Sequence, residues 1–260
     1  MESRSNMTRQ FYRRYGKRLF DLVVSGTALL ILSPILAVTA LLVRRYLGSP
    51  VLFCQERPGY QTQLFQICKF RSMTDARGPN GEFLDDSLRH TPFGKFLRSS
   101  SLDELPELWN VFVGQMSLVG PRPLRTHFLP YYNAEQSRRH DVMPGITGWA
   151  QVNGRNQSSW EDRFRCDVWY VDNMSFSLDL KILWMTVMTV VSRKAVDAED
   201  GGEFPDFTGT KEDLRVESYE RPSDLQLVAP GFELYKSFQN PLNDEIGSEI
   251  REFVTPPTGI

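Results

Sequence analysis

The sequence predicts a membrane-associated α+β protein, on three observations. Residues 19–43 are almost wholly apolar, over about the 20 residues that a helix needs to cross a bilayer. Residues 51–55 and 64–70 have the composition of two short strands on either side of a turn. Residues 105–113 and 178–191 are apolar but too short to span a membrane, which favours helices that lie in its surface or pack in a core.

The net charge of −2 conceals an opposition between the body and the tail of this 260-residue chain. Residues 195–260 contain 15 acids and 5 bases, which leaves 32 − 15 = 17 acids and 30 − 5 = 25 bases for residues 1–194. A body at +8 indicates anionic partners, namely lipid head groups, nucleotides or nucleic acid. The tail, at −10, is either an ordered appendage or largely disordered.

The cysteines and histidines are scattered along the chain. Cys54, Cys68 and Cys166 show no close pair and no metal-type spacing, so we expect three reduced thiols in a protein that faces the cytosol. The three histidines are equally dispersed, which argues against a zinc site.

The apolar stretch 19–43 has Ser33-Pro34 at its middle, where proline removes a backbone hydrogen bond. Basic residues flank it on both sides, so the distribution of charge gives a single span no preferred orientation. Two topologies remain open: a helix that breaks at Ser33-Pro34 and returns to the same face, or a kinked span. The flanking bases are Arg13, Arg14, Lys17, Arg18, Arg44 and Arg45.

The second strand ends in two cations. Lys69 and Arg71 lie at the end of the expected hairpin, where they can face a ligand. The alternative is that Lys69 protects an edge strand from pairing with another chain.

Two adjacent carboxylates, Asp103 and Glu104, form the most informative local pattern. Ionised neighbours repel each other, and a divalent cation or nearby guanidinium groups would stabilise them. Arg98 precedes the pair and Arg122 follows it, which suits phosphoryl chemistry. The alternative is a solvated pair that opens a helix over residues 102–113, with Ser101 as N-cap and Glu104 completing a capping box.

Arg155 lies between Gly154 and Asn156, on a turn from which it can reach a phosphate. Its alternative is a structural role in that turn.

Ten motifs in succession resemble the bacterial sugar transferases known as monotopic polyprenyl-phosphate hexose-1-phosphate transferases, or phosphoglycosyl transferases. Their order and density over residues 17–194 make the resemblance specific. The motifs lie at residues 17–21, 33–34, 69–73, 97–98, 101–106, 116–123, 139–140, 144–156, 167–170 and 177–181.

The resemblance implies a re-entrant membrane helix broken at Ser33-Pro34 and a small hairpin that carries the active site. It implies a membrane segment at residues 1–45 and a catalytic domain at 46–194, which leaves the acidic stretch 195–260 as a C-terminal extension. The catalytic domain and both termini would then lie on the cytoplasmic face of the bacterial inner membrane.

The resemblance also implies a reaction. Asp103 would attack the β-phosphate of a UDP-sugar and expel UMP, and undecaprenyl phosphate would then take the sugar phosphate from the aspartate. Glu104 is the expected Mg²⁺ ligand. The remaining site residues by resemblance, as phosphate, nucleotide or polar site partners, are Lys69, Arg98, Arg122, Arg155 and Asp179.

Some features fall outside the resemblance. Gln115 stands where the family pattern usually has Asp, and the resemblance does not cover the tail. From its charge, we expect the tail to order against the body or against a second subunit in a homodimer. Membrane lipids are expected partners and nucleic acid is not, because no recognition motif is present.

Competing interpretations are a hydrolase of the same chemistry and a non-catalytic scaffold of a glycan-assembly complex. The sugar is not disclosed by the sequence.

Overall fold

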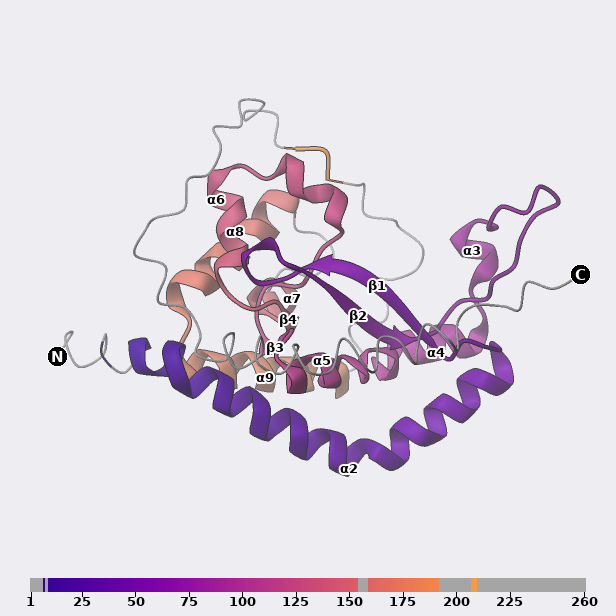
Figure 1. Cartoon of the computed structure of the whole chain (residues 1–260), viewed down its shortest axis with the longest axis horizontal. Helices are drawn as coiled ribbons and strands as arrows, with labels where there is room; N and C mark the ends of the chain where they lie inside the picture. The colour runs from indigo at the N-terminus through magenta and orange to yellow at the C-terminus, as the bar shows by residue number, and fades with distance from the viewer. Residues whose placement is uncertain (1–6, 8, 154–158, 192–206, 210–260) are drawn as a thin grey trace, which may run out of the picture.

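The computed structural model describes residues 7, 9–153, 159–191 and 207–209 and confirms a mixed helix and sheet fold (Figure 1). Several single turns of 3₁₀-helix connect its elements. The helices and strands are α2 (Lys17–Tyr46), β1 (Leu52–Pro58), β2 (Leu64–Phe70), α3 (Asp86–Arg89), α4 (Pro92–Ser99), α5 (Glu107–Val113), β3 (Ser117–Val119), α6 (Ala134–Ser137), β4 (Gly145–Thr147), α7 (Trp149–Asn153), α8 (Trp160–Asn173) and α9 (Phe176–Val191).

Helix α2 is the apolar segment, and it stays helical through Pro34. The expected break is therefore a bend: Figure 1 shows α2 curved near its middle, with both ends directed toward the rest of the chain. Pro34 has no N–H to donate to the carbonyl of Leu30, and the Ser33 hydroxyl donates to that carbonyl instead, at 2.8 Å. The helical stretch Arg9–Tyr46 is long and apolar enough to cross a membrane, and only 11% of its most apolar window is buried.

The two halves of α2 pack on different elements. The first half lies on α5, where Arg18 donates to the carbonyls of Val111 and Phe112 at 2.6 and 2.7 Å. These carbonyls lie in the last turn of α5, where the backbone N–H of Gly114 also donates to Val111 at 3.1 Å, so Arg18 adds to the cap at that end of the helix. In the second half, Val43 packs with Phe70 of β2 and Leu97 of α4.

Strands β1 and β2 form an antiparallel ribbon, as the alternating pattern predicts. Its register places Cys54 directly opposite Cys68, with their Cα atoms 4.1 Å apart, and the two form a disulfide. The expectation of three reduced thiols is therefore wrong for this pair, and only Cys166 is a free thiol. Linear spacing did not reveal the pair because the strand register, not the spacing, brings the two together.

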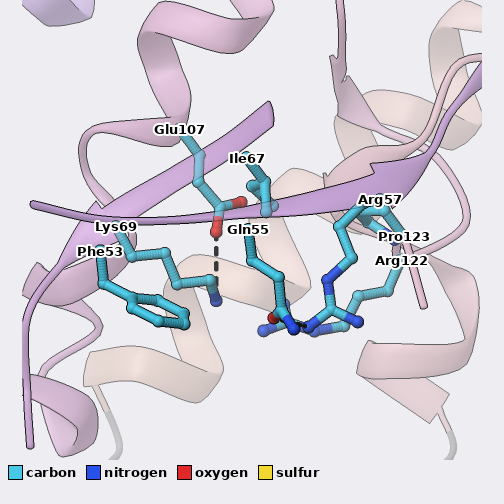
Figure 2. Close-up of a pocket in the computed structure, with 8 residues that line it drawn as sticks. All are labelled: Phe53, Gln55, Arg57, Ile67, Lys69, Glu107, Arg122 and Pro123. Carbon is cyan, nitrogen blue, oxygen red and sulfur yellow. Dashed lines mark hydrogen bonds and ion pairs between the residues drawn. The ribbon is translucent and has the colours of Figure 1, made fainter. Parts of the chain in front are cut away.

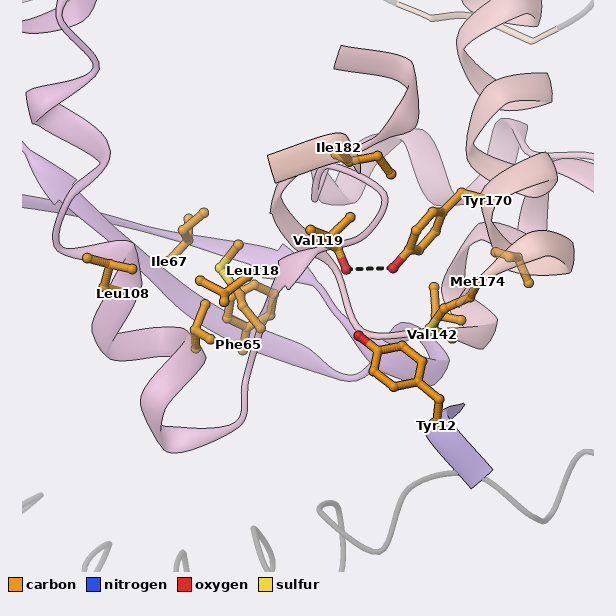
Figure 3. Close-up of a cluster of buried hydrophobic side chains, with 13 residues drawn as sticks. Tyr12, Phe65, Ile67, Leu108, Leu118, Val119, Val142, Tyr170, Met174 and Ile182 are labelled. Atoms are coloured by element: carbon orange, nitrogen blue, oxygen red, sulfur yellow. Dashed lines mark hydrogen bonds between the residues drawn. The ribbon is translucent and has the colours of Figure 1, made fainter. Parts of the chain in front are cut away.

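A second, two-stranded sheet pairs β3 with β4 in parallel. Glycines allow the chain after β3 to approach the start of β4: a Cβ on Gly145 would lie 2.1 Å from the backbone nitrogen of Gly120. The adjoining core gathers side chains from both sheets, α5, α8 and α9 (Figure 3). Within it the hydroxyl oxygen of Tyr170 lies 3.0 Å from the Val119 carbonyl oxygen, which places β3 against α8. This close packing also fixes the loop that follows Gly120.

The helix predicted over residues 102–113 is confirmed over residues 107–113, but its start and its capping box are wrong. A 3₁₀ turn occupies Leu102–Glu104, and α5 begins only at Glu107. Ser101 adopts a left-handed conformation, with φ +54°, and its side chain makes no capping hydrogen bond. An N-cap residue has extended backbone angles, so the conformation of Ser101 excludes that role.

Part of the acidic tail packs on the body. Phe207 is 3% exposed and lies among aromatic side chains from the segment before α6 and from α8. Its ring centroid is 4.9 Å from that of Phe164 and 5.9 Å from that of Tyr132. The expectation that the tail orders against the body or a subunit is thus supported at this one point.

Candidate active site

The 3₁₀ turn between α4 and α5 holds the two adjacent carboxylates. Asp103 is 8% exposed, and the backbone N–H of Glu104 donates to the Ser101 carbonyl at 3.3 Å. The left-handed Ser101 turns the chain sharply after α4 and so places the pair against β2. Local backbone geometry, not helix capping, therefore positions the dyad.

Glu104 is held by two cations from distant segments. Lys69 of β2 donates to its Oε1 atom at 2.7 Å, and Arg122 donates to the same oxygen. Burial alone would raise the pKa of Glu104, but the charges of Arg122 and Lys69 lower that pKa to about 2. The pairing also raises the pKa of Arg122 above its ordinary value. Glu104 is thus a permanent anion that fixes both cations.

Glu107 is a third carboxylate at the site, and the sequence interpretation missed it. Its side chain is 1% exposed, and its Oε1 lies 3.1 Å from the Nζ atom of Lys69. This is within ion-pair distance, but that oxygen has no hydrogen-bond partner among the described residues. Burial and the negative charge of Glu104 raise the pKa of Glu107 to about 7. The i, i+3 spacing from Glu104 was the available signal, because such residues share one helical face.

Burial dominates the electrostatics of Asp103. Burial and the charge of Glu104 raise the pKa of Asp103 to about 6, against the opposing charges of Lys69, Arg98 and Arg122. A carboxyl group with this pKa is about 90% ionised at pH 7. Asp103 is therefore an anion with little solvation, which is the state a nucleophilic carboxylate requires.

Arg98 lies at the end of α4, beside this pair. Its Nε atom donates to the Ser72 hydroxyl at 3.0 Å, and its Nη1 lies 3.4 Å from Nε2 of His90. These contacts hold the guanidinium group where its charge reaches Asp103.

An open hollow adjoins the dyad (Figure 2). One face of the β1–β2 ribbon forms one wall, and α5 and the loop after β3 contribute the rest. Asp103 and Glu104 are not among its lining residues, whereas Lys69 and Arg122, which hold Glu104, are. The lining residues are Phe53, Gln55, Arg57, Ile67, Lys69, Glu107, Arg122 and Pro123.

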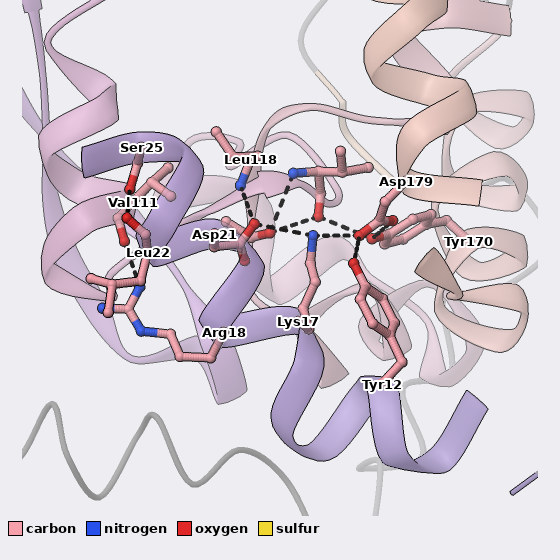
Figure 4. A network of polar contacts seen from close by, with 12 residues as sticks. Tyr12, Lys17, Arg18, Asp21, Leu22, Ser25, Val111, Leu118, Tyr170 and Asp179 are labelled. Carbon is pink, nitrogen blue, oxygen red and sulfur yellow. Dashed lines mark hydrogen bonds and ion pairs between the residues drawn. The ribbon is translucent and has the colours of Figure 1, made fainter. Parts of the chain in front are cut away.

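Asp179 belongs to a different cluster of polar side chains (Figure 4). It is fully buried and accepts hydrogen bonds from Tyr12 at 2.6 Å, Lys17 at 2.6 Å and Tyr170 at 2.8 Å. Lys17 also lies 3.3 Å from Asp21, whose carboxylate accepts from the backbone of β3. The structure therefore places Asp179 where it fastens the start of α2 to α8 and α9, apart from the Lys69–Glu104–Arg122 contacts. Arg155 lies outside the described residues.

The two carboxylates of the dyad could supply some, though not all, of the ligands of a magnesium ion. Among the described residues there is no group of three or more His, Cys, Asp or Glu side chains that could hold a metal ion. Magnesium, however, commonly binds through one or two carboxylates and substrate phosphates, and the adjacent carboxyl groups of Asp103 and Glu104 provide that number. The site can thus bring together an anionic nucleophile, cations for a phosphate and a carboxylate for a metal ion.

Fold and site together define a membrane-associated protein whose buried carboxylates and surrounding cations suit an anionic substrate. The chain belongs to the bacterial sugar transferase family, whose model matches residues 12–193.

Known proteins of this kind resemble it closely. It is 50% identical over 194 residues to the uncharacterized sugar transferase EpsL of Bacillus subtilis, covering 75% of this chain and 96% of EpsL. It is 44% identical over 181 residues to a UDP-glucose:undecaprenyl-phosphate glucose-1-phosphate transferase of Klebsiella pneumoniae, covering 66% of this chain and 39% of that protein. For the transferase of the same name in Escherichia coli, identity is 38% over 192 residues, covering 70% of this chain and 41% of that protein. The chain thus spans nearly all of EpsL but only about two fifths of the other two relatives.

Proposed function

We propose that this protein transfers a sugar 1-phosphate from a UDP-sugar to undecaprenyl phosphate at the cytoplasmic face of the inner membrane, releasing UMP. The observation that carries the proposal is the buried Asp103 beside Glu104, Lys69 and Arg122, on a body joined to an apolar bent helix. The printed names of the relatives in Klebsiella and Escherichia support the same reaction.

The reaction proceeds in two displacements at one phosphorus atom. A carboxylate oxygen of Asp103 attacks the β-phosphorus of the UDP-sugar, and the bond from that phosphorus to the bridging oxygen breaks. UMP leaves with the bonding electrons, and a sugar-phosphoryl aspartate remains. A phosphate oxygen of undecaprenyl phosphate then attacks the same phosphorus, which restores the Asp103 carboxylate and yields the lipid-linked sugar diphosphate. A covalent intermediate lets a soluble nucleotide and a membrane-bound lipid use one site in turn.

Attack by one anion on another requires positive charge at the site. Lys69, Arg98 and Arg122 reduce the repulsion between Asp103 and the diphosphate, and their charges already act on Asp103. Glu104 would hold Mg²⁺ together with the substrate phosphates, and the ion would add positive charge where the leaving group forms. The protein's own contribution is to keep Asp103 ionised, shielded from water and oriented toward the phosphorus atom.

The bend of α2 supports a re-entrant topology. Both ends of the helix are basic and point toward the body, so one face of the membrane accommodates both (Figure 1). The exposed apolar side chains of α5 and α9, among them Trp109 and Trp184, extend the surface available to lipid. This arrangement holds the site at the interface, where the phosphate of a polyprenyl lipid lies.

The acidic tail remains the proposed site of contact with a second subunit. The docking of Phe207 among aromatic side chains of the body supports ordering of the tail. If the protein truncated after Arg193 kept its oligomeric mass and activity in detergent, the proposal for the tail would be wrong.

UMP release from a panel of UDP-sugars, with and without undecaprenyl phosphate and Mg²⁺, tests the function. Asp103→Asn should abolish release with every donor, whereas Asp172→Asn, at an exposed pair with Arg138 on the surface, should not. Release that continues in Asp103→Asn would refute the nucleophile. Release in many turnovers without the lipid would instead indicate a hydrolase.

A further inference from the structure

The region around the dyad carries more positive charge than its carboxylates neutralise. Three carboxylates and four cations act on one another there, which leaves an excess of one positive charge when all are ionised. The carboxylates are Asp103, Glu104 and Glu107, and the cations are Arg57, Lys69, Arg98 and Arg122. Because the site is partly buried, this excess attracts an anion more strongly than it would in bulk water.

Arg57 is the cation in this group that neither the sequence nor the resemblance assigned. It lies on the ribbon face that also carries Phe53 and Gln55, because residues two apart in a strand point to the same side. Its Nη2 atom donates to the side-chain oxygen of Gln55 at 2.7 Å, a neutral partner that orients the guanidinium group without neutralising it. In Figure 2 the ends of the Gln55, Arg57 and Arg122 side chains lie close together.

Among the residues that the structure describes, no carboxylate forms an ion pair with Arg57, whose hydrogen bond goes to the neutral Gln55. Burial and then the charges of Arg125 and Arg122 lower the pKa of Arg57 to about 10, against the opposing charge of Glu107. Arg57 therefore stays protonated at neutral pH although two other arginines act on it. A planar guanidinium group in such a place can bind a phosphate through two parallel hydrogen bonds.

The position of Arg57 relative to the nucleophile selects which phosphate it meets. Arg122 contacts Glu104 of the dyad and also lines the hollow with Arg57, so it lies between the two. Arg57 is thus farther from Asp103 than Arg122 is. In a diphosphate, the phosphate that is not attacked is likewise farther from the nucleophile than the phosphate that is attacked.

The two ends of the β1–β2 ribbon lie differently with respect to the apolar helix α2, which distinguishes a site for a soluble ligand from a site for a lipid. Lys69 is near the end of β2 that lies by α4, whereas Arg57 is at the opposite end of the ribbon. Figure 1 shows that the opposite end rises away from α2. A phosphate bound there belongs to a nucleotide rather than to a lipid whose chain lies in the membrane beside α2.

We propose that Arg57, oriented by Gln55, binds the phosphate that stays with the nucleotide when the sugar phosphate is transferred, so that the hollow is the UMP subsite. The inference rests on the proposed function, since it presumes a nucleoside diphosphate donor.

The test compares the binding of UMP and of uridine to the full chain in detergent by calorimetry. Arg57→Gln should weaken UMP binding about 10- to 100-fold, the usual effect of losing a charge-assisted hydrogen bond, and should leave uridine binding unchanged. Arg57→Lys keeps the charge and should weaken UMP binding less than Arg57→Gln does. It also provides the measurement if Arg57→Gln does not fold. Arg165→Gln, an exposed arginine paired only loosely with Asp162 at 3.5 Å, is the matched control.

Kinetic measurements complete the test. The KM for the UDP-sugar should rise with Arg57→Gln, while the KM for undecaprenyl phosphate should not change. Equal losses for UMP and uridine, or a change confined to the KM for the lipid, would overturn the inference but leave the proposed function intact. A wild-type protein that neither binds UMP nor releases it from any UDP-sugar would refute both.

Discussion

The free energy of unfolding of the wild-type protein should fall between about pH 4.5 and pH 7 as Glu107 ionises, and replacing Glu107 by glutamine should abolish this fall. Burial and the charge of Glu104 raise the pKa of Glu107 from 4.5 to about 7 in the folded state. The folded protein therefore binds this proton more tightly than the unfolded chain does. The resulting stabilisation is fully present below pH 4.5 and is lost as the pH rises through 7.

The size of the effect follows from the shift. A difference of 7 − 4.5 = 2.5 pKa units corresponds to about 3 kcal/mol of unfolding free energy. No reduction for solvent screening applies, because the side chain of Glu107 is 1% exposed. Glu104 has the opposite shift, from 4.5 to about 2, so its contribution is gained between pH 2 and pH 4.5, outside this window.

The assay is chemical unfolding in detergent, followed by tryptophan fluorescence at pH 4.5, 6 and 8, with EDTA and without nucleotide. From pH 4.5 to pH 8, the stability of Glu107→Gln relative to wild type should rise by about 3 kcal/mol. Glu135→Gln is the control, because that side chain is 65% exposed and pairs with Arg138 on the surface. If the Glu107→Gln and wild-type curves ran parallel over this range, the reasoning on burial would be refuted.

Two further predictions concern α2 and the tail. Ser33→Ala removes the hydroxyl that donates to the Leu30 carbonyl and should cost about 1–3 kcal/mol of stability in lipid nanodiscs. Pro34→Ala should straighten α2 and expose an N-terminal cysteine label on the opposite membrane face, and unchanged labelling would contradict the bend as the cause of the topology. Phe207→Ala should lower the free energy of unfolding by about 3–5 kcal/mol, because it leaves a cavity in an aromatic cluster. Phe83→Ala, at a half-exposed ring, is the control and should lower it far less. Equal losses of stability would contradict docking of the tail.

The sequence predicted those elements whose local pattern and final packing agree. Strand β2 runs over the predicted residues 64–70, and α9 begins two residues before the predicted start. The capping box failed because Ser101 turns left-handed and because Lys69 and Arg122 bind the glutamate that would complete it. Such contacts join distant segments, so a local motif cannot reveal them.

The candidate site was predicted in part. Lys69, Glu104 and Arg122 meet as proposed, and the charge of Arg98 reaches Asp103. Glu107 and Arg57 were missed, since Glu107 looks like an ordinary helical acid and Arg57 lies between the two predicted strands, in the expected turn. Asp179 was grouped with the site by resemblance alone, whereas its hydrogen bonds join the start of α2 to α8. Register and burial decide these cases, and neither is readable from spacing.

The ion pairs of the site also explain how it assembles. Lys69 comes from β2, Glu104 from the turn before α5, and Arg122 from the loop after β3. These side chains are only partly exposed, so each of them without its partners would lose hydration that nothing replaces. The three segments therefore stabilise one another at this point, with Glu104 as their shared anion. An incoming phosphate then meets cations that are already in position, so little of its binding energy is used to order the site.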